Sequence, residues 1–355
     1  MRACFEKFPM IVDDWIARKI GVPEGRNLTR AALDVWQLCK LHETLDYVYA
    51  HSSFYREGLA AAVESGKSFS RFDSPGCIGD LPFTTPADLV SAGTAMVCVP
   101  ASEVGRIVTL PTSGTKGAPK RVWFTDADQE LMVDYIRHGL PVMTRTDDVF
   151  LILMPCMRPG SIGDLVAVGV ERIGARVLRV GAISTDGVRD TEVLELMRRE
   201  GVSTGLATAH TAARLAKKSE GDAVIKKNMR TILLSAQYVS DEEKTAVEQI
   251  WDCKVYEHYG MTEMGLGGAM ACETRVGYHP READLLFEIV DPETGKVLPD
   301  GEYGEIVFTT LTRRAMPLIR YRTGDFSRTL PGMCNCGSVL KRLDRVSNRV
   351  ERKAY

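Results

Sequence analysis

The sequence of 355 residues contains no long hydrophobic run. Its longest apolar stretches, such as Val149–Cys156 and Leu285–Val290, are far shorter than the ~20 residues that a membrane-spanning helix needs. The segment Met1–Asp14 mixes charged residues and a proline among its apolar residues, which excludes the apolar core of a signal peptide. We therefore expect no transmembrane segment and a cytoplasmic protein.

An excess of charge of one sign is also lacking. The 45 Lys and Arg residues nearly balance the 47 Asp and Glu residues, which leaves a formal net charge of -2. This balance provides no global field to draw the protein onto nucleic acid or an anionic membrane. Neither partner is expected, and any anionic ligand must be held by local groups.

A disulfide framework is not indicated either. The nine cysteines are an odd number and are spread along the chain, which is typical of reduced thiols. With 45% hydrophobic and 26% charged residues, the composition is that of a globular protein that can bury a sizeable core. The length allows roughly two or three domains, or one continuous α/β body.

The order of the predicted elements indicates an α/β protein. Apolar residues at helical spacing predict a helix over 32–49 and a shorter one over 58–64. From residue 104 onward, β-rich runs alternate with helical ones: Arg106–Leu110 with Asp126–His138, Val149–Met154 with Ile162–Arg172, and Ala175–Val180 with Thr191–Glu200. This rhythm predicts βα units in a parallel sheet with helices on its faces.

The last third of the sequence has a different pattern of apolar and turn-forming residues. A strand at Thr231–Leu234 precedes a capping box at Ser240–Glu243 that opens a helix through Ile250. After Gly277, turn signals separate short β-rich runs, which predicts an antiparallel sheet or small barrel with strands at Leu285–Val290, Gly304–Thr310 and Leu318–Tyr321. We divide the chain into a mainly helical part (1–100), an α/β core (101–275), a β-rich subdomain (276–340) and a hinge segment (341–355).

The most informative motif is the loop that follows the strand at Arg106–Leu110. Its glycines let backbone N–H groups approach an anion, its hydroxyl residues add donors and its lysines supply positive charge. The residues concerned are Ser113, Gly114, Thr115, Lys116, Gly117 and Lys120. The glycine spacing, with Pro119 before the last lysine, differs from that of a Walker A loop. The pattern predicts a phosphate cradle, although a surface turn fits the loop taken alone equally well.

Two further motifs suit a nucleotide. In the first, Tyr259 offers a flat face for a purine, Thr262 a hydroxyl for a phosphate, and Glu263 a carboxylate for Mg²⁺. In the second, which begins at Tyr321, the carboxylate of Asp325 can accept hydrogen bonds from the two hydroxyls of a ribose. Taken singly, each motif has a plain alternative: a solvated glutamate beside a core tyrosine, and a turn aspartate.

Together these motifs resemble the core signatures of the adenylate-forming superfamily of acyl-CoA synthetases, adenylation domains and luciferases. The closer resemblance is to the phenylacetate-CoA ligase and coenzyme F390 synthetase branch, and it runs from about residue 30 to 346. The sequence segments on which this resemblance rests occur in the same order as in that branch: Asp80–Thr85, Glu257–Glu263, Phe287–Gly295, Asp300–Gly304 and Met316–Asp325. The resemblance implies the α/β fold of the adenylate-forming large N-terminal domain, with parallel sheets flanked by helices and a small antiparallel β-barrel-like subdomain.

The resemblance also implies an activity. A small, aryl carboxylic acid would be joined to AMP at the expense of MgATP, with release of pyrophosphate, and the acyl group would pass to CoA or another acceptor. Lys116, Lys120, Thr262 and Glu263 would be catalytic, with Glu263 holding Mg²⁺. The remaining nucleotide contacts would come from Ser113, Gly114, Thr115, Gly117, Ser235, Ala236, Gln237, Glu257, His258, Tyr259, Asp325 and Arg345. Such chemistry needs alignment and neutralisation of phosphate charge rather than a protein nucleophile.

Two departures from the family pattern shape the hypothesis. Lys116 stands where the family has a hydroxyl residue, and we expect this cation to stabilise the departing pyrophosphate. The chain ends at Tyr355, just past a degraded hinge in which Ser347 replaces an aspartate, so we expect the small C-terminal domain and its lysine to be absent. Turnover would then rely on Lys116 or on a partner protein, and a homodimer stays open. The alternative is a catalytically reduced nucleotide-binding regulatory or assembly protein.

A separate constellation contains soft metal ligands. Cys272 and His279 form one pair and Cys334 and Cys336 another, which suits a tetrahedral structural zinc that ties the α/β body to the C-terminal segment. The resemblance supports zinc, because the phenylacetate-CoA ligase branch carries similar positions. Buried free thiols beside a solvated histidine are the alternative.

The acid substrate is expected among three loops, at 154–164, 206–214 and 265–269. Arg158 is the only obvious carboxylate partner there, because guanidinium groups pair well with carboxylates. A surface arginine on a turn is an equally good interpretation.

Overall fold

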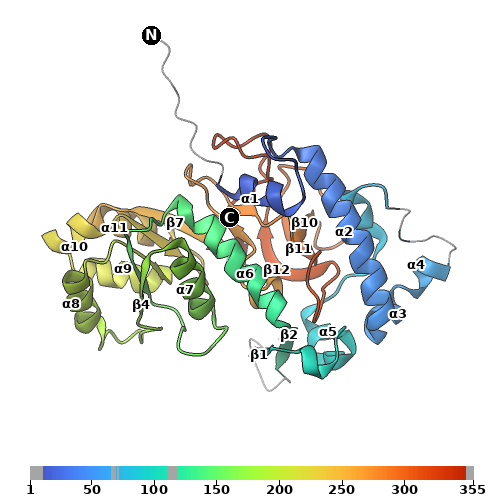
Figure 1. The fold of residues 1–355 in the computed structure, drawn as a ribbon, viewed down its shortest axis with the longest axis horizontal. Helices are drawn as coiled ribbons and strands as arrows, with labels where there is room; N and C mark the ends of the chain where they lie inside the picture. The colour runs from blue at the N-terminus through green and yellow to red at the C-terminus, as the bar shows by residue number, and fades with distance from the viewer. Residues whose placement is uncertain (1–10, 65–68, 70–71, 111–118, 349–355) are drawn as a thin grey trace, which may run out of the picture.

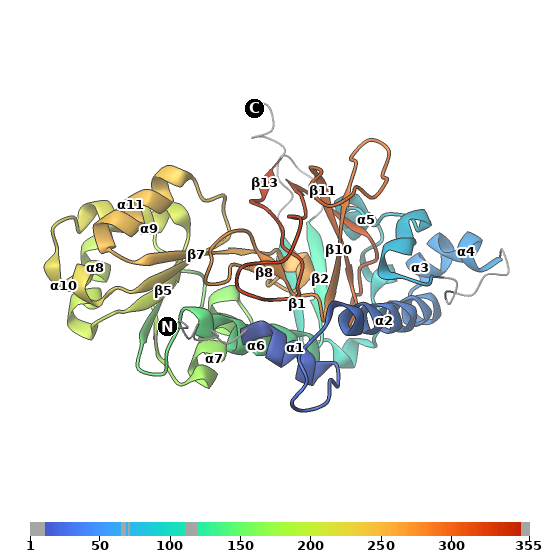
Figure 2. The ribbon, with the colours of Figure 1, turned by 90° about the horizontal axis from the view of Figure 1, so that it is seen from above.

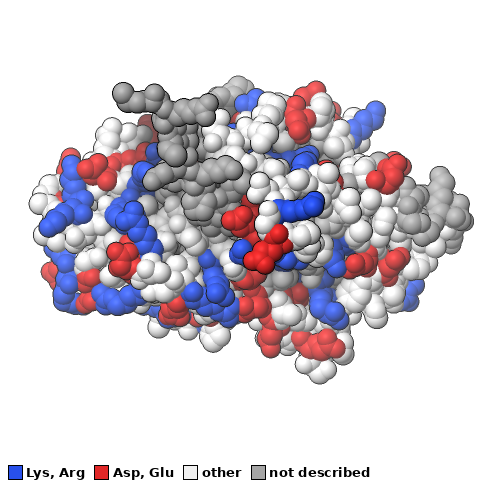
Figure 3. Space-filling view, turned by 45° about the horizontal axis from the view of Figure 1, so that its top comes forward, with Lys and Arg blue, Asp and Glu red and all other residues white. Residues whose placement is uncertain are grey.

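The computed structural model describes residues 11–64, 69, 72–110 and 119–348. Figure 1 shows an elongated molecule with two lobes. The lobe on the left contains most of a helix-flanked sheet, and the lobe on the right contains the N-terminal helices and an antiparallel sheet. Acidic and basic side chains are interspersed over the face seen in Figure 3, in keeping with the near-neutral composition.

A seven-stranded sheet of order β4-β3-β5-β6-β7-β8-β9 forms the centre of the first lobe. The first five strands are parallel, whereas β8 and β9 are antiparallel to their neighbours. The strands are β3 (Val149–Ile152), β4 (Arg176–Arg179), β5 (Thr204–Ala207), β6 (Thr231–Leu234), β7 (Lys254–Tyr259), β8 (Ala269–Met270) and β9 (His279–Pro280). The strands predicted at 149–154, 175–180 and 231–234 are confirmed, while β5 was not predicted.

Alternate residues of the parallel strands enter two separate hydrophobic cores. Phe150 and Ile152 of β3 join the core that includes α6 and α7, whereas Leu151 and Leu153 join the core under α8, α9 and α11. Figure 2 shows the two helical layers on opposite faces of the sheet. The helices are α6 (Asp126–Gly139), α7 (Ile162–Ile173), α8 (Asp190–Glu200), α9 (Ala209–Lys218), α10 (Ala223–Asn228) and α11 (Asp241–Trp251). Burial on both faces explains why the central strands β3 and β6 are almost continuously apolar.

The predicted capping box at the start of α11 is confirmed. Ser240 accepts a hydrogen bond from the Glu243 backbone N–H, and the Glu243 carboxylate bonds back to Ser240. A second capping box begins α6, where Thr125 and Asp128 cap each other. The Asp128 carboxylate also accepts bonds from the backbone at 314 and 315, which ties α6 to the other lobe.

Residues 106–110 do not belong to the parallel sheet. This strand, β1 (Arg106–Leu110), pairs antiparallel with β2 (Lys120–Phe124) in a separate two-stranded hairpin. Our prediction that it opens a parallel βα unit is therefore wrong. The apolar residues of β1 do not indicate whether its neighbour runs parallel or antiparallel to it. The strand β2 was not predicted, because its first residue, Lys120, was assigned to the phosphate loop. The hairpin sets Lys120 at the first position of a strand.

A four-stranded antiparallel sheet of order β10-β11-β12-β13 lies in the other lobe. Its strands are β10 (Leu285–Val290), β11 (Gly304–Thr310), β12 (Tyr321–Ser327) and β13 (Ser347–Asn348). The first two match the prediction, but the third begins at Tyr321 instead of Leu318. The backbone N–H groups of Leu318 and Arg320 donate to threonine hydroxyls of β11 rather than to a strand ladder, which delays the strand.

The N-terminal helices lie beside this antiparallel sheet, with the first of them packed against α6. They are α1 (Ile11–Lys19), α2 (Arg30–His51), α3 (Ser53–Gly58), α4 (Ala60–Glu64) and α5 (Pro86–Ser91), with short 3₁₀ turns η2 (Pro75–Asp80), η3 (Gly93–Met96) and η4 (Ala101–Glu103). Two further 3₁₀ turns, η5 (Leu140–Val142) and η6 (Thr262–Met264), follow α6 and β7. The helix predicted at 32–49 is confirmed, whereas the one at 58–64 is divided at Leu59. Trp36 and Gln37 of α2 donate to backbone carbonyls at 283 and 282, over 2.9 and 2.8 Å. No helix among the described residues is both long and apolar enough to cross a membrane.

Candidate active site

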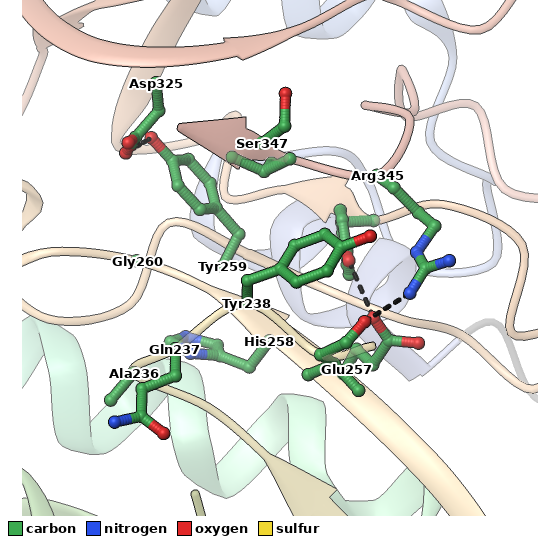
Figure 4. A pocket seen from close by; sticks show the side chains of 13 residues that line it. Ala236, Gln237, Tyr238, Glu257, His258, Tyr259, Gly260, Asp325, Arg345 and Ser347 are labelled. Atoms are coloured by element: carbon green, nitrogen blue, oxygen red, sulfur yellow. Dashed lines mark hydrogen bonds between the residues drawn. The ribbon is translucent and has the colours of Figure 1, made fainter. Parts of the chain in front are cut away.

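A cavity of about 210 Å³ lies where β6 and β7 end (Figure 4). It is lined by residues 236–239, which follow β6, by residues 257–260 of β7 and its end, and by Asp325 and residues 345–347 of the antiparallel lobe. The carboxyl ends of parallel strands are the usual position of ligand sites in α/β sheets. This cavity, here called the nucleotide cavity, gathers the predicted residues Ala236, Gln237, Glu257, His258, Tyr259, Asp325 and Arg345.

Tyr259 and Asp325 are joined across the two lobes. The Tyr259 hydroxyl donates to Asp325 Oδ2 over 3.0 Å, the bond drawn in Figure 4. The other carboxylate oxygen of Asp325 has no hydrogen-bond partner within the described part of the chain. Burial raises the pKa of Asp325, and the bond from Tyr259 opposes that shift. The structure thus leaves one acceptor oxygen at the cavity for a hydroxyl donor.

Glu257 and Arg345 are held by other residues of the cavity wall. The Glu257 carboxylate accepts from Lys244 Nζ over 2.7 Å and from the Tyr278 hydroxyl over 2.9 Å. Arg345 pairs with Asp241 over 2.6 Å, and its guanidinium lies 5.5 Å from the centre of the Tyr238 ring. Both charged groups are therefore already engaged and shape the cavity.

His258 carries a neutral imidazole beside Ser235. Ser235 Oγ lies 3.0 Å from His258 Nδ1, while the buried Nε2 has no partner among the described residues. Burial, assisted by the positive charge of Arg281, lowers the pKa of His258 to about 4. The alternation of side chains along β7 points His258 to the sheet face opposite Tyr259.

Lys120 and Glu263 meet although they are 143 positions apart in the sequence. Glu263, only 2% exposed, accepts from Lys120 Nζ over 2.7 Å and from the Tyr321 hydroxyl over 3.1 Å. Both bonds go to the same oxygen, Oε1. Thr262 is the preceding residue in η6 and is half-buried. The structure thus places residues from all three sequence motifs in one region.

The rest of the predicted phosphate loop lies outside the described residues. Ser113, Gly114, Thr115, Lys116 and Gly117 fall within 111–118, so Lys120 alone represents this motif.

A cavity of about 10 Å³ lies in the region expected to bind the acid. Arg106, Gly160 and Leu266 are among its lining residues. Arg158 does not line it and is exposed, whereas the buried Arg106 Nε lacks a hydrogen-bond partner within the described ranges. Arg106 was not identified as a site residue from the sequence. Its one signal in the sequence is a positive charge at the first position of a mostly apolar strand.

The four predicted metal ligands form one cluster. The ligand atoms of Cys272, His279, Cys334 and Cys336 all lie within 4.8 Å of one another. Two edges of this cluster, Cys272 Sγ to Cys334 Sγ and Cys336 Sγ to His279 Nε2, measure 3.7 and 3.4 Å. A tetrahedron with Zn–S bonds of ~2.3 Å has edges of about 3.8 Å. His279 Nδ1 lies 3.1 Å from the Lys341 carbonyl, which can only accept, so Nε2 keeps its lone pair for a metal.

The chain belongs to the AMP-binding enzyme family, whose pattern matches residues 70–311, and it is an adenylate-forming ligase. It is 30% identical to the phenylacetate-coenzyme A ligase of Thermus thermophilus over 93% of this chain and 73% of that protein. The phenylacetate-coenzyme A ligase of Escherichia coli is also 30% identical, over 89% of this chain and 71% of that protein. The family that the sequence motifs predicted is confirmed.

The fold agrees with solved structures. A crystal structure of 2-hydroxyisobutyryl-CoA ligase, in complex with 2-HIB-AMP and CoA, superposes with a TM-score of 0.80 at 22% identity and covers 91% of this chain and 69% of that one. A long-chain-fatty-acid-CoA ligase from Archaeoglobus fulgidus gives a TM-score of 0.52 at 17% identity, covering 71% of this chain and 53% of that one. The predicted fold class is thereby confirmed.

Proposed function

We propose that this chain activates a small aryl carboxylic acid as its acyl-adenylate and then transfers the acyl group to CoA. One observation carries the proposal: the segments around Lys120, Glu263 and Asp325, far apart in the sequence, meet beside one cavity at the carboxyl ends of β6 and β7. The names of the relatives, which are phenylacetate-coenzyme A ligases, support both the aryl acid and CoA.

The residue roles follow from the free groups of the cavity. Tyr259 and the backbone at 236–239 hold the adenine, and the free carboxylate oxygen of Asp325 accepts from the ribose. Thr262 contacts the α-phosphate from η6. The already engaged Glu257 carboxylate and Arg345 guanidinium keep the walls in place.

Lys120 and Glu263 neutralise each other in the structure. Each therefore needs a replacement partner when the pair separates: a phosphate anion suits Lys120, and a hard cation such as Mg²⁺ suits the carboxylate of Glu263. MgATP supplies both together. The attacking carboxylate then bonds to the α-phosphorus as the bond to pyrophosphate breaks, and Lys120, with Lys116, balances the charge of the departing pyrophosphate. We expect Lys116→Thr to slow this step.

Arg106, rather than Arg158, is the carboxylate partner that we propose for the acid. Its Nε is buried and unpartnered at the small cavity, whereas Arg158 is exposed. A cavity of about 10 Å³ is too small for an aryl acid, so side chains such as Leu266 must move when the acid binds. Arg106→Gln should raise the KM for the acid about tenfold, with Arg158→Gln as the matched control.

Zinc at Cys272, His279, Cys334 and Cys336 is the structural part of the proposal. The donor set and edge lengths fit the tetrahedral geometry of structural zinc. The cluster joins the segment after β8 to the segment before β13, which would fix the chain that carries Arg345.

Product analysis tests the acceptor. The chain is incubated with MgATP, CoA and a panel of phenylacetate, benzoate and 2-hydroxyisobutyrate, and the products are identified by mass spectrometry. The proposal predicts an aryl-CoA thioester. A parallel reaction contains hydroxylamine, which traps an acyl-adenylate as the acyl-hydroxamate. Acyl-hydroxamate without any thioester would support adenylation but would mean that the acyl acceptor is another molecule or a partner protein rather than CoA. Absence of both products would favour the nucleotide-binding regulatory protein.

A further inference from the structure

A larger cavity lies at the opposite end of β6 and β7. Its volume is about 780 Å³, against about 210 Å³ for the nucleotide cavity. Thr231 and Lys254, the first residues of β6 and β7, line it, whereas the nucleotide cavity is lined from the carboxyl ends of the same strands. The parallel sheet therefore separates this basal cavity from the adenylation site.

The basal cavity has an apolar floor on one side and the Cys and His cluster on another, since Cys272, His279 and Cys336 also line it. Apolar side chains come from α1, from the turn after α6, from the end of α10, and from the segments around β8 and before β13. They include Val12, Val142, Met143, Met229, Met270 and Leu340. Tyr135 of α6 also lines the cavity and is only 1% exposed. Its hydroxyl finds no hydrogen-bond partner among the described residues. Because buried hydroxyls are almost always bonded, this orphan donor points to an acceptor atom supplied by a ligand.

The rim of the basal cavity is basic. Arg145, Lys226, Lys227 and Lys254 are exposed there and form no ion pair within the described ranges, while Arg230 is paired with Asp148.

The acidic residues of the lining do not cancel this charge. Asp13 lines the cavity but is already engaged, because its carboxylate accepts from Ser338 Oγ over 2.5 Å and from the Val339 N–H over 3.0 Å. Asp252 and Glu273 remain, and Glu273 lies within electrostatic reach of Lys254. The free rim cations thus outnumber the free carboxylates in a chain whose net charge is -2.

We propose that the basal cavity binds an amphipathic anion, which is a ligand class distinct from the nucleotide. Its apolar aryl or acyl body would contact the floor, an oxygen would accept from the Tyr135 hydroxyl, and a carboxylate or phosphate ester would lie at the lysine rim. An apolar body alone would leave the rim cations unused, and a small inorganic anion would leave most of the floor empty. The floor and the rim together require both parts in one molecule.

Calorimetric titration of the full chain tests this proposal, with 1-naphthyl phosphate and 4-phenylbutyrate as probes. Saturating AMP fills the nucleotide cavity first, and Arg106→Gln, which lacks the proposed contact to the acid, serves as a second background. Binding that remains unchanged in this variant reports the basal cavity. We expect one site per chain for at least one probe, and comparison of the two probes identifies the preferred anion. The charge reversal K226E/K227E should weaken binding about tenfold, whereas K217E/K218E on α9, also exposed and outside the cavity, should change it less than about twofold.

Tyr135→Phe separates a ligand contact from a packing role. It should weaken probe binding several-fold while leaving the melting temperature unchanged or raised, because it removes an unsatisfied buried hydroxyl. The proposal is overturned if neither probe binds the AMP-saturated chain, or if K226E/K227E binds as tightly as wild type. If Tyr135→Phe binds the probes as tightly as wild type, the Tyr135 hydroxyl does not contact the ligand, and that part of the proposal is contradicted.

Discussion

Asp325 shows how a single residue ties the nucleotide cavity to both lobes. One of its carboxylate oxygens is bonded to Tyr259 over 3.0 Å, and the other, which has no partner among the described residues, is the acceptor that we propose for a ribose hydroxyl. Asp325→Asn keeps the shape but removes the charge, so we expect AMP affinity to fall about tenfold. Isothermal titration measures this, with the exposed Asp147→Asn as control. Equal AMP affinities for wild type and Asp325→Asn would refute the ribose assignment.

His258 should give the acid stability of the protein a specific signature. Its pKa is lowered from 6.5 to about 4 by burial and by Arg281. As the pH falls, the unfolded chain takes up this proton first, so the stability associated with neutral His258 is complete above about pH 6.5 and is lost toward pH 4. His258→Gln should flatten the loss of stability between these values in denaturant titrations. The exposed His210→Gln is the control, and identical slopes for wild type and His258→Gln would count against the shift.

Residues with a motif around them were predictable, and residues defined by tertiary context were not. Tyr259, Glu263 and Asp325 were predicted because each belongs to a short motif of neighbouring residues in the sequence. The unpartnered Nε of Arg106 and hydroxyl of Tyr135 have no such pattern, since a missing partner depends on how distant segments pack.

At the scale of elements, local patterns predicted type better than pairing. The strand at Arg106–Leu110 was placed correctly, but its partner is β2 in a hairpin rather than a parallel neighbour. The start of β12 was displaced because side chains of β11 take the N–H groups of Leu318 and Arg320. Both errors concern hydrogen-bond partners, which apolar periodicity does not specify.

The Cys and His cluster makes a prediction about how elements are held together. We expect about one zinc per chain, because structural sites bind a single ion with four protein ligands. Cys336→Ser should lower both the zinc content and, by several degrees, the melting temperature, since binding of structural zinc contributes folding free energy. Elemental analysis and thermal unfolding measure the two effects, with the exposed Cys39→Ser as control. A metal-free native chain of equal stability, with freely reactive thiols at 272, 334 and 336, would contradict the zinc site.

At the scale of the whole molecule, the two lobes contribute complementary halves of one site. The parallel sheet provides Tyr259 and Glu263 at the end of β7, and the antiparallel lobe provides Asp325 and Tyr321 from β12. Family membership was predictable because the motif phrases occur in order along the chain. The basal cavity was not, because its walls come from segments that no motif connects.

ATP–pyrophosphate exchange across a panel of carboxylic acids tests the central claim most directly, because it detects adenylation whatever the final acceptor. We predict exchange that requires both Mg²⁺ and an acid, is fastest with an aryl acid, and falls about a hundredfold in Glu263→Gln as the carboxylate beside Lys120 is lost. Absence of exchange with every acid, in a chain that still binds MgATP, would contradict adenylation and leave a nucleotide-binding protein.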